Sequence, residues 1–297
     1  ICTDKTGTIT MNEMTARELW AGDARYTVTG RGYDLRGGIK PMGKETQEDG
    51  ATLARLLRCG ALCNRGIVPR GRRHHAGLGD PLDEALRGLA VKGGLEPDGE
   101  RREWPLVREF PFHAERRLMS TVHQNSGERV LFLKGGPAET LARCRSEMRK
   151  GTPEPLTEER RDELAQRANE MSDRGLRVLA FAYRAVDEGD RLESAEDAEQ
   201  RLVFLGAAGL DNPLRPEVPA AVDNCRSAGI QVVMLTGDHA HTALVVAGQA
   251  HIAVEGSKAV TGAQVDAMGD EELDRLLRES RPAVFARVAP EQKLRLV

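Results

Sequence analysis

One segment, residues 230–250, restricts the fold more than any other. The apolar, partly β-branched run 230–235 is typical of a strand buried in a parallel sheet, and the turn residues Thr236, Gly237 and Asp238 follow it directly. A helix is expected next at 242–250, and a further short strand at 283–286. Strand, turn, helix and strand in this order predict a parallel α/β sheet.

A candidate nucleophile lies at the beginning of the chain. Asp4 ends a short apolar run and is followed by the turn Lys5-Thr6-Gly7-Thr8. The hydroxyls and backbone N–H groups of such a turn hold a phosphoryl group while a carboxylate attacks it. The alternative interpretation is a polar turn that closes a strand and has no chemical role.

Three polar motifs come directly after predicted strands, and ligands of open parallel sheets gather at the carboxyl ends of the strands. They are Asp4 with its turn, Thr236-Gly237-Asp238, and Arg287 with Lys293. Together they provide a nucleophile, a phosphate cradle and a cation, as phosphoryl transfer requires. Taken singly, the alternatives are a plain turn in which Asp238 caps the next helix, and a solvated helix lysine at Lys293.

Residues 13–211 have a different pattern, in which short strands alternate with helices and the loops are rich in Gly, Arg and Pro. Strands are expected at 25–28, 129–133 and 177–183, and helices at 51–62, 82–91 and 158–171. This pattern predicts an α+β domain inserted after the first strand of the α/β sheet. The predicted domains are residues 1–12 together with 212–297, and the insertion 13–211.

Composition excludes several classes of protein. A net charge of −3 over 297 residues argues against a nucleic-acid partner. The five cysteines lack zinc-type spacing, and a reduced cytosolic setting fits them. No apolar stretch approaches the roughly 20 residues that cross a bilayer, so we expect a soluble chain without direct membrane insertion. Because the chain has no initiator Met and stops inside an apolar pattern, we expect a fragment.

The polar motifs resemble those of P-type ATPases, the ion pumps that pass through an aspartyl-phosphate. Asp4-Lys5-Thr6-Gly7-Thr8 is similar to their phosphorylation motif, and segments 236–239 and 285–293 are similar to further motifs of their haloacid-dehalogenase-like phosphorylation domain. Segments 79–83, 109–120, 134–137 and 175–180 resemble motifs of their nucleotide-binding domain, and 215–218 a motif that follows it. The order and spacing look most like the calcium-pump branch, which includes bacterial cation pumps.

The resemblance implies a fold and a role for each matching residue. The fold is a haloacid-dehalogenase-like parallel sheet with an inserted α+β nucleotide-binding domain. Asp4 attacks the γ-phosphate of ATP and, with the Thr6 carbonyl, binds Mg²⁺. The other implied catalytic residues offset negative charge or hold the phosphoryl oxygens: Lys5, Thr8, Thr236, Gly237, Asp238 and Lys293.

The implied nucleotide-binding residues lie mostly in the insertion. Phe112 offers a ring face for adenine, although core packing is the alternative, and Lys134 supplies a cation after an apolar strand. Arg177 reaches a phosphate or ribose, or is a surface arginine. The full implied set is Asp83, Phe112, Arg117, Met119, Lys134, Gly135, Arg177, Leu179, Asn212 and Arg287.

One position separates a pump from a phosphatase. Phosphatases of this fold carry a second aspartate two residues after the nucleophile, and this chain has Thr6 there. Such proton-transfer groups contribute roughly 10²–10⁴-fold, so an aspartyl-phosphate on Asp4 is expected to hydrolyse slowly. The sequence departs from the family pattern at Asp83, Ala114, Arg117 and Asn212.

The sequence therefore predicts the cytoplasmic ATP-binding and aspartyl-phosphate-forming portion of a cation pump. Its implied cofactors are ATP and Mg²⁺, and its implied partners are the membrane and actuator domains of the same protein. The fragment alone is expected not to be competent for the full reaction, and its residues do not specify the ion. The alternatives are a soluble phosphatase or phosphotransferase of the same superfamily, and a non-catalytic nucleotide-binding remnant of a pump.

Overall fold

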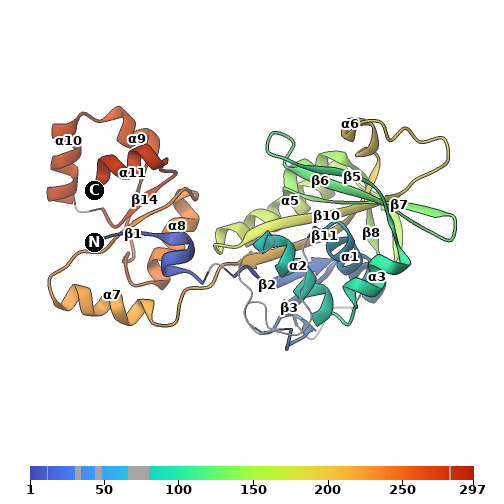
Figure 1. Ribbon diagram of the computed structural model, residues 1–297, viewed down its shortest axis with the longest axis horizontal. Coiled ribbons are helices and arrows are strands. Elements are labelled where there is room, and N and C mark those ends of the chain that lie inside the picture. The colour runs from blue at the N-terminus through green and yellow to red at the C-terminus, as the bar shows by residue number, and fades with distance from the viewer. Residues whose placement is uncertain (12, 31–34, 44–48, 66–79, 281) are drawn as a thin grey trace. The chain divides into compact units, whose positions relative to one another are not determined.

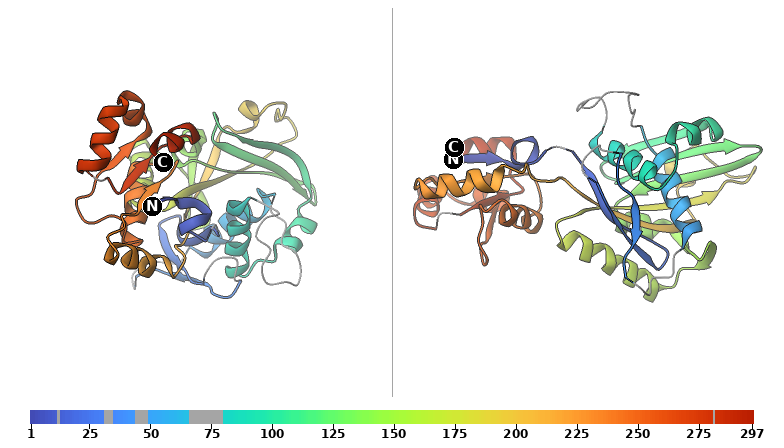
Figure 2. Two further views of the ribbon diagram at one scale, coloured as in Figure 1. Left: turned by 60° about the vertical axis from the view of Figure 1, so that its left-hand side comes forward. Right: turned by 90° about the horizontal axis from the view of Figure 1, so that it is seen from below.

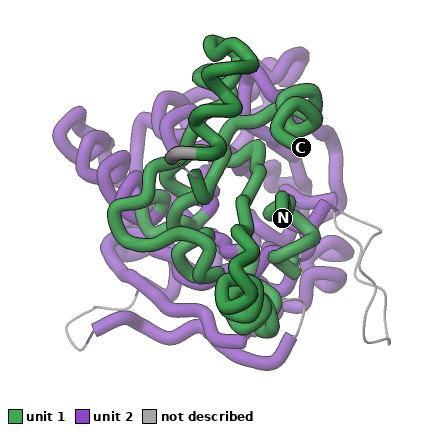
Figure 3. Tube along the Cα trace, turned by 90° about the vertical axis from the view of Figure 1, so that its left-hand side faces the viewer, with its two compact units in different colours: residues 1–13, 172–176, 212–297 green, residues 14–171, 177–211 purple. Residues whose placement is uncertain are grey.

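The structure is a computed structural model that describes residues 1–11, 13–30, 35–43, 49–65, 80–280 and 282–297. These residues form two compact units (Figure 3). The first contains residues 1–13, 172–176 and 212–297, and the second contains residues 14–171 and 177–211. Each unit has its own sheet, and the fold is mixed α/β with parallel and antiparallel strands. Gly79, which begins one of the nucleotide-domain motifs, lies outside the described residues.

The first unit is built on a parallel sheet with the order β1-β12-β14-β13. Figure 1 labels two of these strands, β1 and β14. Its strands are β1 (Cys2–Asp4), β12 (Val233–Leu235), β13 (Ala259–Thr261) and β14 (Val284–Ala286). Its helices are α7 (Val218–Ser227), α8 (Ala240–Gln249), α9 (Gly262–Ala267), α10 (Asp270–Arg275) and α11 (Pro290–Leu296), with a further turn η2 (Leu276–Ser280).

Both faces of this sheet are covered, which explains why its strands read as continuous apolar runs. Met234 and Val284 pack with residues of α7 and α8, whereas Leu235 and Phe285 pack with residues of α9, α10 and α11. Consecutive residues of each strand therefore pack into two different cores, one on each face of the sheet. Burial of both faces fixes the register of β12 and β14.

The strand expected at 230–235 is shorter than predicted, because β12 begins only at Val233. Ile230 instead donates its backbone N–H to the carbonyl of Cys225 at 2.9 Å, and Gly229 adopts a φ of 73°. These contacts close the carboxyl end of α7. The amino half of the apolar run thus terminates a helix, and only the other half enters the sheet.

The second unit contains a mainly antiparallel sheet with the order β4-β3-β2-β11-β10-β7-β6-β5, extended by β8 and β9 at β11. Figure 2 shows its strands from two further sides. The strands are β2 (Thr15–Ala21), β3 (Ala24–Val28), β4 (Ile39–Pro41), β5 (Leu106–His113), β6 (Leu118–Asn125), β7 (Glu128–Gly135), β8 (Cys144–Arg149), β9 (Thr152–Pro155), β10 (Arg177–Ala185) and β11 (Leu202–Asp211). The apolar run 202–205 is the beginning of β11 in this sheet.

Helices α1 (Gly50–Leu62) and α2 (Pro81–Lys92) share one core with this sheet, which includes Leu56 of α1, Leu86 of α2 and Phe181 of β10. Asp49 and Asp80 begin the two helices by accepting hydrogen bonds from backbone N–H groups of the first turn. The remaining helices are α3 (Pro97–Glu103), α4 (Pro137–Arg143), α5 (Glu158–Asp173) and α6 (Ala195–Ala198).

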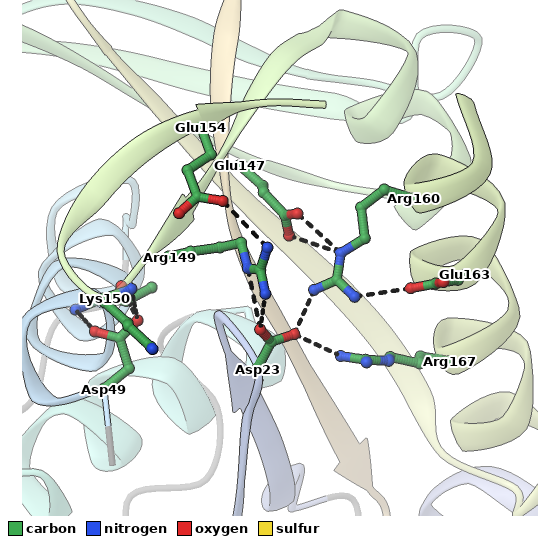
Figure 4. A network of polar contacts seen from close by, with 10 residues as sticks. Asp23, Asp49, Glu147, Arg149, Lys150, Glu154, Arg160, Glu163 and Arg167 are labelled. Carbon is green, nitrogen blue, oxygen red and sulfur yellow. Dashed lines mark hydrogen bonds and ion pairs between the residues drawn. The ribbon is translucent and has the colours of Figure 1, made fainter. Parts of the chain in front are cut away.

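A network of ion pairs joins three parts of the second unit (Figure 4). Asp23, in the turn between β2 and β3, accepts hydrogen bonds from Arg149 of β8 at 2.7 Å and Arg160 of α5 at 2.5 Å. Arg167 of α5 approaches the same carboxylate at 3.7 Å, and Arg160 also bonds Glu147 of β8 at 2.8 Å. Asp23 therefore ties α5 and β8 to the β2–β3 turn.

Within the described ranges, every helix is too short or too polar to span a membrane.

Candidate functional site

The turn after β1 presents Asp4 at the carboxyl edge of the parallel sheet. Asp4 ends β1 opposite Leu235 of β12. The residues that follow do not form a continuous helix, since Thr6 is extended and Gly7 has a φ of 77°. The hydroxyl of Thr10 accepts the N–H of Gly7 at 3.3 Å and donates to the carbonyl of Lys5 at 3.1 Å, which closes the loop.

Two ion pairs connect this turn to segments more than 200 residues later in the chain. The ammonium of Lys293, on α11, lies 2.5 Å from Oδ2 of Asp4. Lys5 is buried and pairs directly with Asp238, which follows β12. Two lysines and two carboxylates thus meet at one edge of the sheet, where their charges compensate one another.

The turn after β12 adds hydroxyl and amide groups to the same edge. Thr236 is buried, and its hydroxyl accepts the N–H of Asp238 at 3.1 Å. A hydroxyl that accepts one hydrogen bond still carries a proton to donate. At Gly237 a Cβ would meet no atom within 4 Å, so the backbone of this turn faces open space.

Arg215 holds the loop after β1 from the outside, a contact that the sequence did not indicate. Its Nε donates to the carbonyl of Thr8 at 2.9 Å, and a second guanidinium nitrogen donates to the carbonyl of Gly7 at 3.2 Å. The acceptors are backbone oxygens, which no side-chain pattern marks. Arg215 therefore stabilises the conformation of the turn that follows Asp4.

Two residues predicted to bind nucleotide lie in the first unit. Arg287 has a φ of 56°, donates its backbone N–H to the carbonyl of Asp238 at 3.0 Å, and places its guanidinium against the ring of His239. Asn212 is partly buried, and its side-chain oxygen has no hydrogen-bond partner among the described residues. Their roles in nucleotide binding stay predictions.

In the second unit, Lys134 and Asp83 form a buried ion pair. Lys134 lies on β7 and Asp83 in the first turn of α2, and their side chains are 6% and 7% exposed. The second oxygen of Asp83 accepts the N–H of Arg65 at 2.9 Å, while its backbone carbonyl accepts from Asn64 at 2.7 Å. Asp83 thus fixes both Lys134 and the chain that leaves α1.

The thiols beside this pair are inert. Cys59, on α1, and Cys63, directly after α1, are fully buried and face the carbonyls of Leu133 and Met119, respectively. Burial raises the pKa of Cys63 to about 11, and it raises that of Cys59 well above its ordinary value. Both cysteines are protonated at neutral pH and are not nucleophiles.

The remaining predicted nucleotide residues divide into exposed and buried ones. Phe112 is 59% exposed at the end of β5, and Arg177 is exposed at the beginning of β10. Met119 and Leu179 are instead buried in the core, at 4% and 8% exposure. The exposed ring of Phe112 therefore fits an external stacking partner better than the core alternative.

Gly135 and Arg117 lie together at the end of β7. A Cβ on Gly135 would lie only 2.5 Å from the carbonyl oxygen of Arg117, so the glycine permits a close approach of two strands. Arg117 adopts a φ of 54°, and its guanidinium pairs with Glu139 of α4 at 2.8 Å. Arg117 is 62% exposed and presents its charge at the surface.

Comparison with known proteins finds one matching family model and relatives that are all named as ATPases. Residues 52–217 match the family model for P-type ATPase, cytoplasmic domain N. The chain is 34% identical over its whole length to a calcium-transporting ATPase of Bacillus subtilis, and 38% identical to the cation-transporting ATPase pma1 of Synechocystis. It is 32% identical to the human calcium-transporting ATPase type 2C member 1.

The alignments cover 100% of this chain but 33%, 33% and 31% of those three relatives, so the chain spans about a third of their length. The family model alone covers more than half of the chain. The chain belongs to the P-type ATPase family.

Proposed function

We propose that this chain is the ATP-binding and aspartyl-phosphate-forming part of an ATP-driven cation pump of the calcium-pump type. The observation that carries the proposal is the position of Asp4, at the carboxyl edge of the parallel sheet, with the Lys293 ammonium 2.5 Å away. The printed names of the relatives, calcium-transporting and cation-transporting ATPases, support the pump.

In this proposal the first unit is a haloacid-dehalogenase-like phosphorylation domain, made of residues 1–12 and 212–297. The inserted nucleotide-binding domain is residues 13–211, and other domains of the same pump, including its membrane part, are its partners. The unit thus works at the cytoplasmic face of a membrane. The parallel strand order and the polar turns after β1, β12 and β14 support this assignment.

The proposed reaction is an in-line displacement. A carboxylate oxygen of Asp4 forms a bond to the γ-phosphorus of ATP, the bond from that phosphorus to the β–γ bridging oxygen breaks, and ADP leaves. Lys293 and Lys5 offset the negative charge that accumulates. The hydroxyls of Thr8 and Thr236 and the N–H of Gly237 hold the phosphoryl oxygens.

The residues present also fit a magnesium ion. Asp4 is half-exposed, and its Oδ1 has no hydrogen-bond partner among the described residues, so one carboxylate oxygen is open to a ligand. With the Thr6 carbonyl it forms an all-oxygen donor set, which Mg²⁺ prefers. When bound, the ion neutralises phosphate charge. Asp4 would offer the ion its free oxygen, Oδ1. Thr6 carries no carboxylate, so it provides no general base for hydrolysis of the aspartyl-phosphate.

The nucleotide is proposed to bind the second unit, with adenine stacked on Phe112 and the cations Lys134, Arg117 and Arg177 around it. The exposed ring of Phe112 and the exposed guanidinium of Arg117 support this arrangement. Lys134 is already neutralised by Asp83, so in this chain it contributes shape and hydrogen bonding more than net charge.

Titration of the chain with ATP and Mg²⁺ by calorimetry tests nucleotide binding. We expect saturable binding, and we expect Phe112→Ala to weaken it about 5–150-fold, since a base–aromatic stack contributes roughly 1–3 kcal/mol. Leu106→Ala is the matched control, because Leu106 lies on the same strand and is 54% exposed. Equal affinity for Phe112→Ala and Leu106→Ala, or no binding by the folded chain, would overturn the proposal.

A further inference from the structure

A cavity of about 560 Å³ lies in the first unit, at the end of the sheet opposite to Asp4. Its wall includes the residues that immediately precede three strands, namely Val232, Lys258 and Ala283. Asp4 ends its own strand of the same parallel sheet. The cavity is therefore separate from the candidate phosphoryl site, and no part of the proposed reaction uses it.

Most of the cavity wall is aliphatic. Val222 of α7 and Ile252 after α8 are buried, with 7% and 8% exposure. Ile230 and Val254 also line the cavity and are 45% and 71% exposed, so they leave apolar surface open to solvent beside it. Binding of an apolar group would bury both of these exposed side chains, and the volume lies within the range of sites for small molecules.

The polar side chains of the wall are basic or neutral. Arg226, His251 and Lys258 line the cavity, and no Asp or Glu is among the described residues of its wall. Asp223 lies outside the wall and holds two of them, with contacts of 2.8 Å to His251 and 3.4 Å to Arg226. Lys258 has no ion-pair partner among the described residues, so the cavity carries a surplus of positive charge.

We propose that this cavity binds an aliphatic carboxylate. The hydrocarbon chain would cover Ile230, Ile252 and Val254, and the carboxylate would lie at Lys258 and Arg226. An anionic head gains the attraction of Lys258 and Arg226, which a neutral ligand does not, and a cationic ligand would be repelled. The chemistry of the wall therefore selects a ligand with an apolar body and one negative head.

Titration of the whole chain with decanoate, kept below its micellar concentration, tests the proposal by calorimetry. We expect saturable binding of one decanoate per chain. Decyltrimethylammonium, whose alkyl chain is one carbon longer and whose charge is opposite, should bind at least about tenfold more weakly. Butyrate, which is shorter by six CH₂ groups, should bind at least about 100-fold more weakly, because each buried CH₂ contributes up to about 0.8 kcal/mol.

Two substitutions at exposed positions locate the binding. Lys258→Gln should weaken decanoate binding about two- to fivefold, the effect of one exposed charge pair, and Val254→Asp about tenfold or more through like charge. Lys40→Gln, an exposed lysine on β4 of the other unit, is the matched control and should change nothing. Thermal unfolding of each variant shows that it is folded.

Equal binding of decanoate and decyltrimethylammonium would overturn the proposal, as would affinities that neither Lys258→Gln nor Val254→Asp changes. An absence of decanoate binding by the folded chain has the same consequence. These outcomes are independent of nucleotide binding at Phe112, because that residue lies in the other unit.

Discussion

The buried ion pair between Lys134 and Asp83 gives the sharpest prediction on stability. Lys134→Met keeps the length of the side chain and removes its charge, which leaves the Asp83 carboxylate 7% exposed without its cation. Among the described residues, the N–H of Arg65 still donates a hydrogen bond to this carboxylate at 2.9 Å. Removing one partner of a buried pair costs about 3–5 kcal/mol, and we expect the free energy of unfolding to fall by this amount.

Tryptophan fluorescence during urea unfolding measures this loss selectively. The chain has two tryptophans, Trp20 and Trp104, and both are buried in the second unit with Lys134 and Asp83. Their signal therefore reports the unfolding of that unit. With a denaturant slope of roughly 2–3 kcal/mol per molar urea, the midpoint should fall by about 1–2 M.

The double variant Lys134→Met with Asp83→Asn separates a coupled pair from two independent contacts. Asparagine removes the unpaired charge but still accepts the hydrogen bond from Arg65, so more than half of the lost stability should return. Lys40→Met, which changes an exposed lysine, is the control. The reasoning is refuted if Lys134→Met costs less than about 1 kcal/mol, or if the double variant is no more stable than the single one.

Three further predictions use the same fluorescence assay. Gly135→Ala should lower the free energy of unfolding by about 1–3 kcal/mol, because the new Cβ would lie 2.5 Å from the carbonyl oxygen of Arg117, and an unchanged midpoint would contradict this. Asp23→Asn should cost about 1 kcal/mol at neutral pH, since its carboxylate is half-exposed and shared by three arginines (Figure 4). Burial raises the pKa of Asp23, but hydrogen bonds from two of these arginines outweigh it and lower the pKa below 3.8. The stabilisation by Asp23 is therefore fully present above pH 3.8 and is lost as the pH falls through the pKa of the folded state. The difference in stability between the wild type and Asp23→Asn should shrink over the same pH range. Burial lowers the pKa of His123 below 6.5 despite its contact with the Trp104 carbonyl, so wild-type stability should fall as the pH drops below 6.5. The unfolding midpoint of His123→Asn should change less than that of the wild type between about pH 7.5 and about pH 5.5. An equal change in both proteins would show that protonation of His123 is not the cause.

The sequence predicted the mixed α/β class and the three longest helices of the second unit, because their apolar periodicity is local. Helices α1 and α2 begin at Gly50 and Pro81, one residue before each expected start. The strand at 230–235 was predicted too long, because the closing contact of Ile230 with α7 depends on the preceding helix. The apolar run alone does not show where that helix ends.

Partners in tertiary contacts were less accessible from the sequence. Lys134 and Asp83 were each singled out for binding a nucleotide, but nothing in the order of residues shows that they pair with each other. Arg215 donates to backbone carbonyls of Gly7 and Thr8, which have no sequence signature. The sequence therefore predicts candidate residues for the chemistry, whereas packing determines which of their charges are already neutralised.

The central claim is that Asp4 accepts the γ-phosphoryl group of ATP. The most direct measurement exposes the whole protein encoded by the gene to Mg²⁺ and ATP labelled at the γ-phosphate, followed by an acid quench and peptide mapping. The account predicts a label on Asp4 that hydroxylamine removes, as expected for an acyl phosphate, and no label in Asp4→Asn. A protein that binds ATP but carries no label, or an Asp4→Asn variant labelled like the wild type, would contradict it.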